Sequence, residues 1–135
     1  MKNDSNSIFE VFKETSDVGT RKRKIKELVK CGVDINTRSE GHGGTVLFHA
    51  FYYPPLVKFL IDMGIDVNAT DKLGRTALMF NLSMADGDRP QYLKSAKIVL
   101  EHGASIKIVD SRGDTAITLA RRFGKKYERL FSSAI

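Results

Sequence analysis

One short phrase recurs in this chain and limits its fold more than any other feature. An acidic residue is followed by glycine three positions later and by threonine five positions later, at 40–47, 71–78 and 110–117. A second phrase that opens with glycine precedes each copy, at 32–36, 64–68 and 103–107. Two phrases that repeat in a fixed order indicate an internal repeat, whose units stack on one another to bury a shared core.

The repeat divides the chain into a single domain, 1–135, of four units. We expect an N-terminal cap unit at 1–38, repeats at 39–70 and 71–109, and a C-terminal cap unit at 110–135. The acidic positions Glu40 and Asp71 are 31 residues apart, whereas Asp71 and Asp110 are 39 apart. Against a period of about 33 residues, unit three therefore carries an insertion, which we place between its helices near 83–92.

The apolar spacing predicts an all-α solenoid of about four helix-turn-helix units with short turn tips. Thr45 and Thr76 are expected to cap inner helices, while Gly32, Gly64 and Gly103 end outer ones. A turn is expected at 17–20. The predicted helices span 5–16, 21–31, 45–52, 55–63, 76–84, 92–101, 115–122 and 125–133.

These phrases resemble the ankyrin repeat, and the resemblance covers nearly the whole chain. The chain departs from the family at the proline that usually follows the threonine, and at the histidine that bridges neighbouring turns. The resemblance therefore implies that these histidine bridges are absent or altered. The residues at the two positions are Val46, Ala77 and Ala116, then Phe48, Met79 and Thr118.

Composition indicates a globular protein with an uneven charge distribution. The net charge is +6; it is +3 over 1–38, −2 over 39–70, +2 over 71–109 and +3 over 110–135. The basic end units leave open a second function, a polyanion- or nucleic-acid-associated binding protein. The single Cys31 and the lack of a long apolar run favour a cytoplasmic protein without a membrane span.

The sharpest charge cluster is Arg21–Lys26. We expect these cations to form the solvated, dispensable face of a capping helix. The alternative is a patch for nuclear entry or for an acidic partner.

No set of residues with catalytic or metal-ligating spacing stands out, so we expect no enzyme activity, no cofactor and no metal. The expected roles are a turn residue for His42, an inner-helix residue for His49 and a helix-end cation for His102, without convergence of the three. Cys31 is expected to pack beside a helix-ending glycine.

The resemblance implies an adaptor- or effector-like monomer that binds another protein through a concave face of turn tips and inner helices. Local packing remains the alternative for each contact residue. We expect Tyr52, Tyr53, Leu73, Arg75 and Met84 to form one site beside the 83–92 segment. The full expected contact set is Tyr52, Tyr53, Lys72, Leu73, Arg75, Met84, Arg112, Asp114 and Arg122, with further family contact positions at Gly41, His42, Gly44, Ser83, Ser111 and Phe123.

Overall fold

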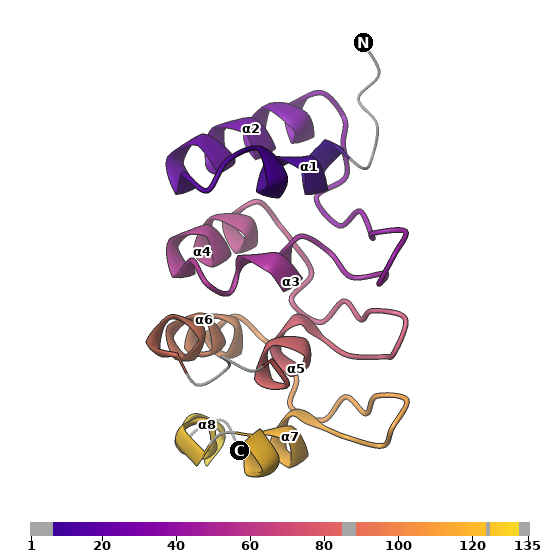
Figure 1. Cartoon of the computed structure of the whole chain (residues 1–135), viewed down its shortest axis with the longest axis vertical. Helices are drawn as coiled ribbons and strands as arrows, with labels where there is room; N and C mark the ends of the chain where they lie inside the picture. Colours follow the sequence, from indigo (N-terminus) through magenta and orange to yellow (C-terminus); the bar gives the residue numbers. More distant parts are fainter. Residues whose placement is uncertain (1–6, 85–88, 124, 133–135) are drawn as a thin grey trace.

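The computed structural model describes residues 7–84, 89–123 and 125–132, and it stacks four helix pairs (Figure 1). The inner helices lie between the outer helices and a row of turn tips. The described residues contain eight helices and no strand, so the predicted all-α solenoid is confirmed. The inner helices are α1 (Ser7–Glu14), α3 (Leu47–Ala50), α5 (Ala77–Leu82) and α7 (Ala116–Phe123), and the outer ones are α2 (Val18–Lys30), α4 (Pro54–Asp62), α6 (Pro90–Glu101) and α8 (Lys125–Ser132).

Three outer helices begin earlier than the sequence predicts, and for α4 the difference is one residue, Pro54 against residue 55. Helix α2 begins at Val18, so 17–20 is not a separate turn; Asp17 caps the helix by accepting the Thr20 amide at 2.8 Å. Helix α6 begins at Pro90 instead of residue 92, because proline is well suited to the first helical turn. The predicted insertion near 83–92 is only partly visible, since 85–88 lie outside the described residues.

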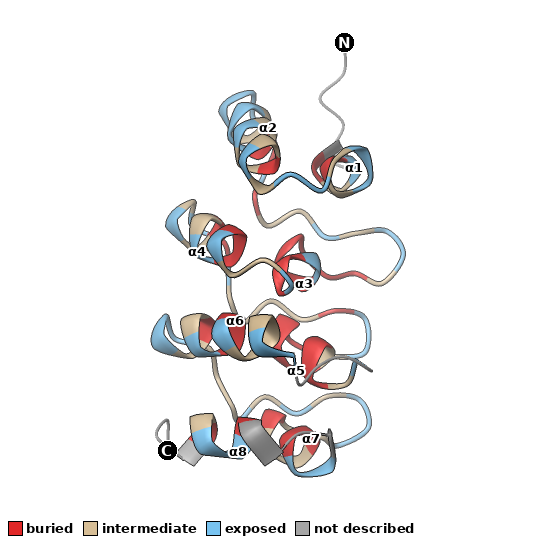
Figure 2. Cartoon of the chain, turned by 60° about the vertical axis from the view of Figure 1, so that its left-hand side comes forward, coloured by how far each residue is buried: buried red, intermediate tan, exposed pale blue. Residues whose placement is uncertain are grey.

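The core runs without a break through all four units. Figure 2 shows the buried positions on the facing sides of the helices, between one layer and the next. Ile25, Leu56 and Val99 are buried in three successive outer helices. Each fully buried aliphatic side chain contributes about 1.5–3 kcal/mol relative to exposure. The stack is therefore held by contacts between neighbouring units, as expected for a repeat that cannot bury its apolar face alone.

The two threonines predicted to cap inner helices behave differently. Thr76 accepts the Met79 amide at 3.3 Å, which confirms the predicted cap of α5. Thr45 does not cap α3, because Val46 after it is already helical and the Phe48 amide bonds the Thr45 carbonyl oxygen instead. Within the described residues the buried Thr45 Oγ1 has no hydrogen-bond partner. The prediction for Thr45 was therefore wrong.

Glycine ends the first three outer helices as predicted. Gly32, Gly64 and Gly103 have φ of 103°, 93° and 93°, in the left-handed region that side chains avoid. The chain leaves each outer helix at this residue and runs toward the next turn tip. The repeat of this glycine therefore sets the spacing of the units.

Asparagine and serine side chains link neighbouring units by hydrogen bonds. The Asn36 Oδ1 accepts the Asp66 amide at 2.7 Å, and one unit further on the Asn68 Oδ1 accepts the Ser105 amide, also at 2.7 Å. Buried Ser95 donates to the Phe51 carbonyl oxygen at 2.7 Å. These bonds satisfy backbone groups at the joints between units.

Arg21 is buried, which contradicts the prediction that the whole 21–26 cluster is solvated. Its side chain is 6% exposed and donates from Nε to the Thr15 carbonyl at 2.8 Å and from Nη2 to the Phe12 carbonyl at 3.2 Å. The guanidinium lies 4.7 Å from the Phe12 ring centroid and 4.8 Å from that of Tyr53. Arg21 thus joins α1, α2 and the start of α4, because it sits on the side of α2 that faces α1.

Candidate functional site

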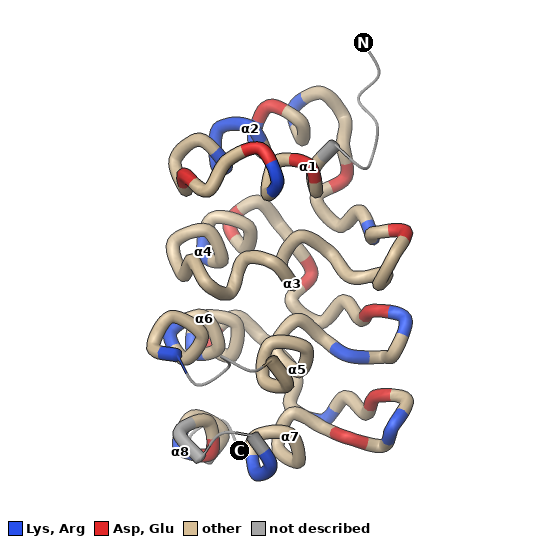
Figure 3. Tube along the Cα trace, viewed as in Figure 1, with Lys and Arg blue, Asp and Glu red and all other residues tan. Residues whose placement is uncertain are grey.

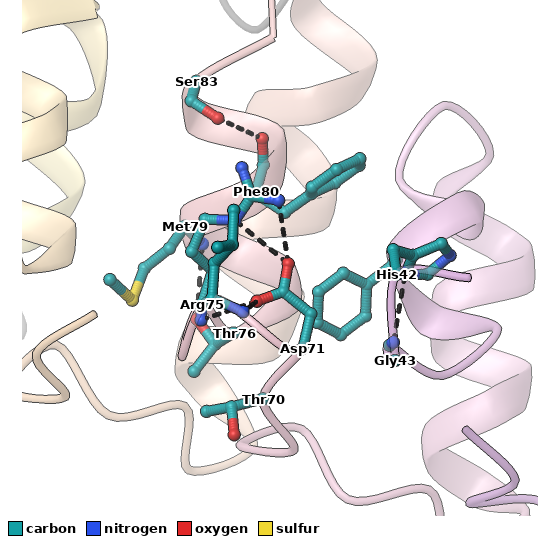
Figure 4. Close-up of polar contacts among 12 residues, drawn as sticks. His42, Gly43, Thr70, Asp71, Arg75, Thr76, Met79, Phe80 and Ser83 are labelled. Atoms are coloured by element: carbon teal, nitrogen blue, oxygen red, sulfur yellow. Dashed lines mark hydrogen bonds and ion pairs between the residues drawn. The ribbon is translucent and has the colours of Figure 1, made fainter. Parts of the chain in front are cut away.

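The turn tip of unit three is built around a buried carboxylate. Asp71 is 4% exposed, and its Oδ1 accepts the amides of Leu73 and Arg75 at 3.0 and 2.9 Å. Its Oδ2 meets Nε and Nη2 of Arg75 at 3.0 and 2.9 Å (Figure 4). The Arg75 guanidinium also lies 5.0 Å from the Phe80 ring centroid. The carboxylate therefore closes the tip and fixes the arginine against α5.

The tip of unit four repeats the two amide bonds of this geometry, but Asp114 stands at the position equivalent to the half-buried Arg75. Asp110 Oδ1 accepts the amides of Arg112 and Asp114, each at 2.9 Å. The Asp114 carboxylate instead pairs with Arg122 of α7 at 3.2 Å. The two tips are joined by the Ser111 amide, which donates to the Leu73 carbonyl at 2.9 Å. The tips thus form one continuous backbone surface.

A cleft of about 270 Å³ opens between these tips and the inner helices α5 and α7. It brings together five residues of the expected contact set, namely Leu73, Arg75, Arg112, Asp114 and Arg122. Asp110 and Leu119 also line the cleft and were not predicted from the sequence. The other lining residues are Ser83 and Ser111.

The cleft offers an apolar surface beside paired charges. Leu73 is 45% exposed at the rim, and Arg112 is exposed next to it on the neighbouring tip. Arginine and exposed apolar side chains on a rigid backbone are typical of protein contact surfaces. Lys72 also belongs to the expected set but does not line this cleft, since its Nζ donates to the Glu40 carbonyl at 2.6 Å, from the tip of unit three to that of unit two.

The two tyrosines lie away from this cleft. Tyr53 is half-buried under the Arg21 guanidinium, and its ring meets that of Tyr52 edge-on at 5.2 Å. Tyr52 is 38% exposed and lies 6.1 Å from the Tyr92 ring of α6. Met84, just after α5, is 45% exposed. The single site expected from the sequence is thus divided into the cleft and a tyrosine cluster near α6.

The turn tip of unit two is closed by different residues. The sequence assigned the acidic position to Glu40, but Ser39 occupies the equivalent place, and its amide donates to the Gly44 carbonyl at 2.9 Å. Ser39 Oγ accepts the amides of His42 and Gly43 at 3.2 and 3.1 Å. The tip of unit two holds one more residue than the tips of units three and four. Glu40 therefore lies one position after the residue that closes the tip. The Gly44 amide, left without a carboxylate, bonds Nδ1 of His42 at 3.0 Å.

His42 and His49 come together, contrary to the expectation that the histidines stay apart. Their Nε2 atoms are 3.0 Å apart. The His49 ring packs among those of Phe9, Phe12 and His42, although the residue as a whole remains exposed. Desolvation of the ring by this packing, with a smaller contribution from His42, lowers the pKa of His49 to about 4. Burial also lowers the pKa of His42. Both rings line a second cleft of about 350 Å³, beside α1.

The described residues contain no cluster of three or more potential metal ligands among His, Cys, Asp and Glu. Within the same ranges, no helix has both the length and the apolar character needed to cross a membrane. Cys31 is exposed, so the expectation that it packs against the helix end was wrong.

Known proteins share the repeat. The model of a family described as ankyrin repeats, in three copies, matches residues 18–110. Ankyrin repeat and SOCS box protein 6 of Pongo abelii is 38% identical over 97 residues, or 70% of this chain and 23% of that protein, and its human counterpart is 37% identical over the same shares. Ankyrin repeat protein OPG025 of Vaccinia virus is 29% identical over 96 residues, covering 67% of this chain and 15% of that protein. The chain thus spans about a quarter or less of the length of these relatives.

Proposed function

We propose that this chain, which belongs to the ankyrin repeat family, binds a partner protein through the cleft between its third and fourth turn tips. Ankyrin repeats are generally protein–protein interaction modules and generally non-catalytic. The observation that carries the proposal is the cleft, where exposed Leu73 lies beside Arg112 on a tightly bonded backbone. A rigid surface loses little entropy on binding, so its apolar and arginine side chains can act as anchors.

The residues around the cleft divide into two roles. Leu73 and Arg112 project from the tips and would contact the partner directly. Arg75 and Arg122 are held by Asp71 and Asp114, so they would shape the wall of the cleft. Tyr52 and Met84 are exposed and would extend the contact surface toward α6.

The alternative of a polyanion binder has less support. Figure 3 shows the cations of α2 on the side of the stack opposite those of the turn tips. A backbone of phosphates is contacted best by cations that follow one track. We therefore favour a protein partner, and we place the module as an adaptor or effector in the cytoplasm, where the exposed thiol of Cys31 would stay reduced.

The proposal is tested by removing the two projecting side chains. A partner is first captured from extract of the native cell with the parent chain, identified and purified. The double variant Leu73→Ala with Arg112→Ala is expected to weaken its binding about 30-fold, because truncation of an interface anchor costs about 2 kcal/mol or more. Both side chains are exposed, so the fold should be unaffected.

A matched control is the double variant Lys94→Ala with Lys97→Ala, which removes two exposed side chains from the outer helix α6. It should bind within about threefold of the parent. If the Leu73/Arg112 variant is folded and binds as tightly as this control, the cleft is not the contact site. Tyr53 and Arg75 are unsuitable for this test because both support the fold.

A further inference from the structure

The hydrogen bonds around His42 and His49 assign the position of each proton. His42 Nδ1 accepts the Gly44 amide at 3.0 Å, so it carries no hydrogen. The proton of neutral His42 is therefore on Nε2, which points at Nε2 of His49 3.0 Å away. His49 must accept there, which places its own proton on Nδ1.

The pair connects three successive units. His49, on α3, lies 6.1 Å from the Phe9 ring and 6.0 Å from the Phe12 ring of the cap helix α1. His42, in the tip of unit two, stacks on Phe80 of α5 at 6.2 Å with an interplanar angle of 18°. The contact between the two histidines thus joins the phenylalanine rings of the cap unit to Phe80 of unit three in one continuous row of packed rings.

Protonation of either histidine breaks one of the two hydrogen bonds described above. A proton on His42 must occupy Nδ1, where it would face the Gly44 amide hydrogen. A proton on His49 occupies Nε2, where it would face the Nε2 hydrogen of His42. Shifting the His42 proton to Nδ1 only moves the conflict to Gly44. Each protonated form therefore loses one hydrogen bond and sets two donors against each other.

We propose that His42 and His49 form a proton-sensitive clasp that holds the cap unit and unit three against the turn tip of unit two, and that acid opens it. The clasp itself needs no partner protein. It lines the cleft beside α1, so its effect on binding would depend on the proposed function, but its response to acid would not.

The charged groups around the pair nearly balance. On α1, Glu10 and Lys13 pair with each other at 3.5 Å. On the tip of unit two, Glu40 lines the same cleft. From unit three, Asp71 raises the pKa of His42, whereas Arg75 and Lys72 lower it. Since the charges largely offset one another, the packing of the two rings against aromatic side chains and the hydrogen-bond pattern decide the protonation state, and both favour the neutral pair.

The same pattern disfavours a metal ion between the rings. A neutral histidine that binds a metal through Nε2 carries its proton on Nδ1. In His42 that proton would face the Gly44 amide hydrogen. A metal ion would therefore break the hydrogen bond between the Gly44 amide and His42. A hydrogen bond between the two Nε2 atoms fits the site better than a metal ion.

The direction of the pH effect follows from the lowered pKa of His49. In the unfolded chain His49 takes a proton near pH 6.5, whereas in the folded chain it does so only near pH 4. Between these values the unfolded state binds more protons. The stabilisation is therefore complete above pH 6.5 and is lost progressively as the pH falls toward 4.

The first experiment compares Tm at pH 7.5 and pH 5.0. His49→Gln removes the titrating ring and keeps an amide oxygen that can accept from His42. His102→Gln, at the end of α6, is the matched control because His102 lies apart from the pair. We expect the parent and His102→Gln to lose about 5 °C more than His49→Gln over this interval. An equal loss in all three proteins would overturn the clasp.

The second experiment needs no variant. Long-range ¹H–¹⁵N spectra of the parent distinguish the two neutral tautomers of each histidine. We expect the Nε2–H form for His42 and the Nδ1–H form for His49 at pH 7.5, with His49 still neutral at pH 5.5. If His49 is already protonated at pH 5.5, or if the two rings show the opposite tautomers, the proposal is wrong.

Discussion

Replacing Arg21 with glutamine is expected to lower the free energy of unfolding by about 2–3 kcal/mol. The change removes the charge from two hydrogen bonds to main-chain carbonyls of Thr15 and Phe12. It also removes the contact of the guanidinium with the rings of Phe12 and Tyr53. A hydrogen bond to a charged group contributes about 1.5–3 kcal/mol, and a desolvated cation–π contact about 2 kcal/mol. Urea denaturation followed by circular dichroism measures the loss.

Arg23→Gln is the control for this prediction. Arg23 lies on the same helix, is exposed, and pairs with Glu27 at 3.8 Å. Its loss should change the free energy of unfolding by no more than about 0.5 kcal/mol. If Arg21→Gln is as mild as Arg23→Gln, Arg21 does not join the cap helices as described.

Replacing Asp71 with alanine is expected to cost about 3 kcal/mol. The carboxylate accepts two backbone amides and holds Arg75 by two further bonds, all while 4% exposed. Its removal leaves two amides and a half-buried arginine without their partner. Breaking such a pair costs more than the pair itself contributes, because the remaining charge stays desolvated. Denaturation in urea again gives the value.

The variant Asp110→Ala separates the two contributions of the Asp71 carboxylate, which are its bonds to backbone amides and its ion pair with Arg75. Asp110 accepts the two equivalent amides in the tip of unit four, but among the described residues its carboxylate forms no ion pair with an arginine. We expect its loss to cost about 1–2 kcal/mol, clearly less than that of Asp71. Equal losses in the two variants would show that the Arg75 pair adds nothing to the tip.

The repeat itself was predictable because its residues act locally. Glycine at the end of an outer helix and threonine before an inner one need only their own neighbours, as Gly64 and Thr76 show. Thr45 has the same local sequence, yet the extra residue in its tip changes the backbone before it. A pattern of residue types does not reveal this shift, because it depends on how Ser39 and Gly44 pair.

The site was less predictable because it depends on distances between units. Arg21 looked like part of a solvated cation run, and only the position of Tyr53 in the next unit explains its burial. His42 and His49 are seven residues apart, and their contact requires the turn of the chain between them. Seven of the nine residues that line the cleft were predicted from the family's contact positions, and Asp110 and Leu119 were not. The separation of the cleft from the tyrosines follows from Tyr53 packing onto Arg21 and Tyr52 onto Tyr92 at the start of α6.

The most direct test of the proposed contact surface is hydroxyl-radical footprinting of the chain alone and bound to its captured partner. This measurement reads the solvent exposure of individual side chains. We expect Leu73 and Met84, both 45% exposed in the free chain, to be protected by the partner, while the exposed Cys31 at the end of α2 keeps its reactivity. Protection of Cys31 and of the outer helices, with Leu73 and Met84 unchanged, would contradict binding through the turn tips and inner helices.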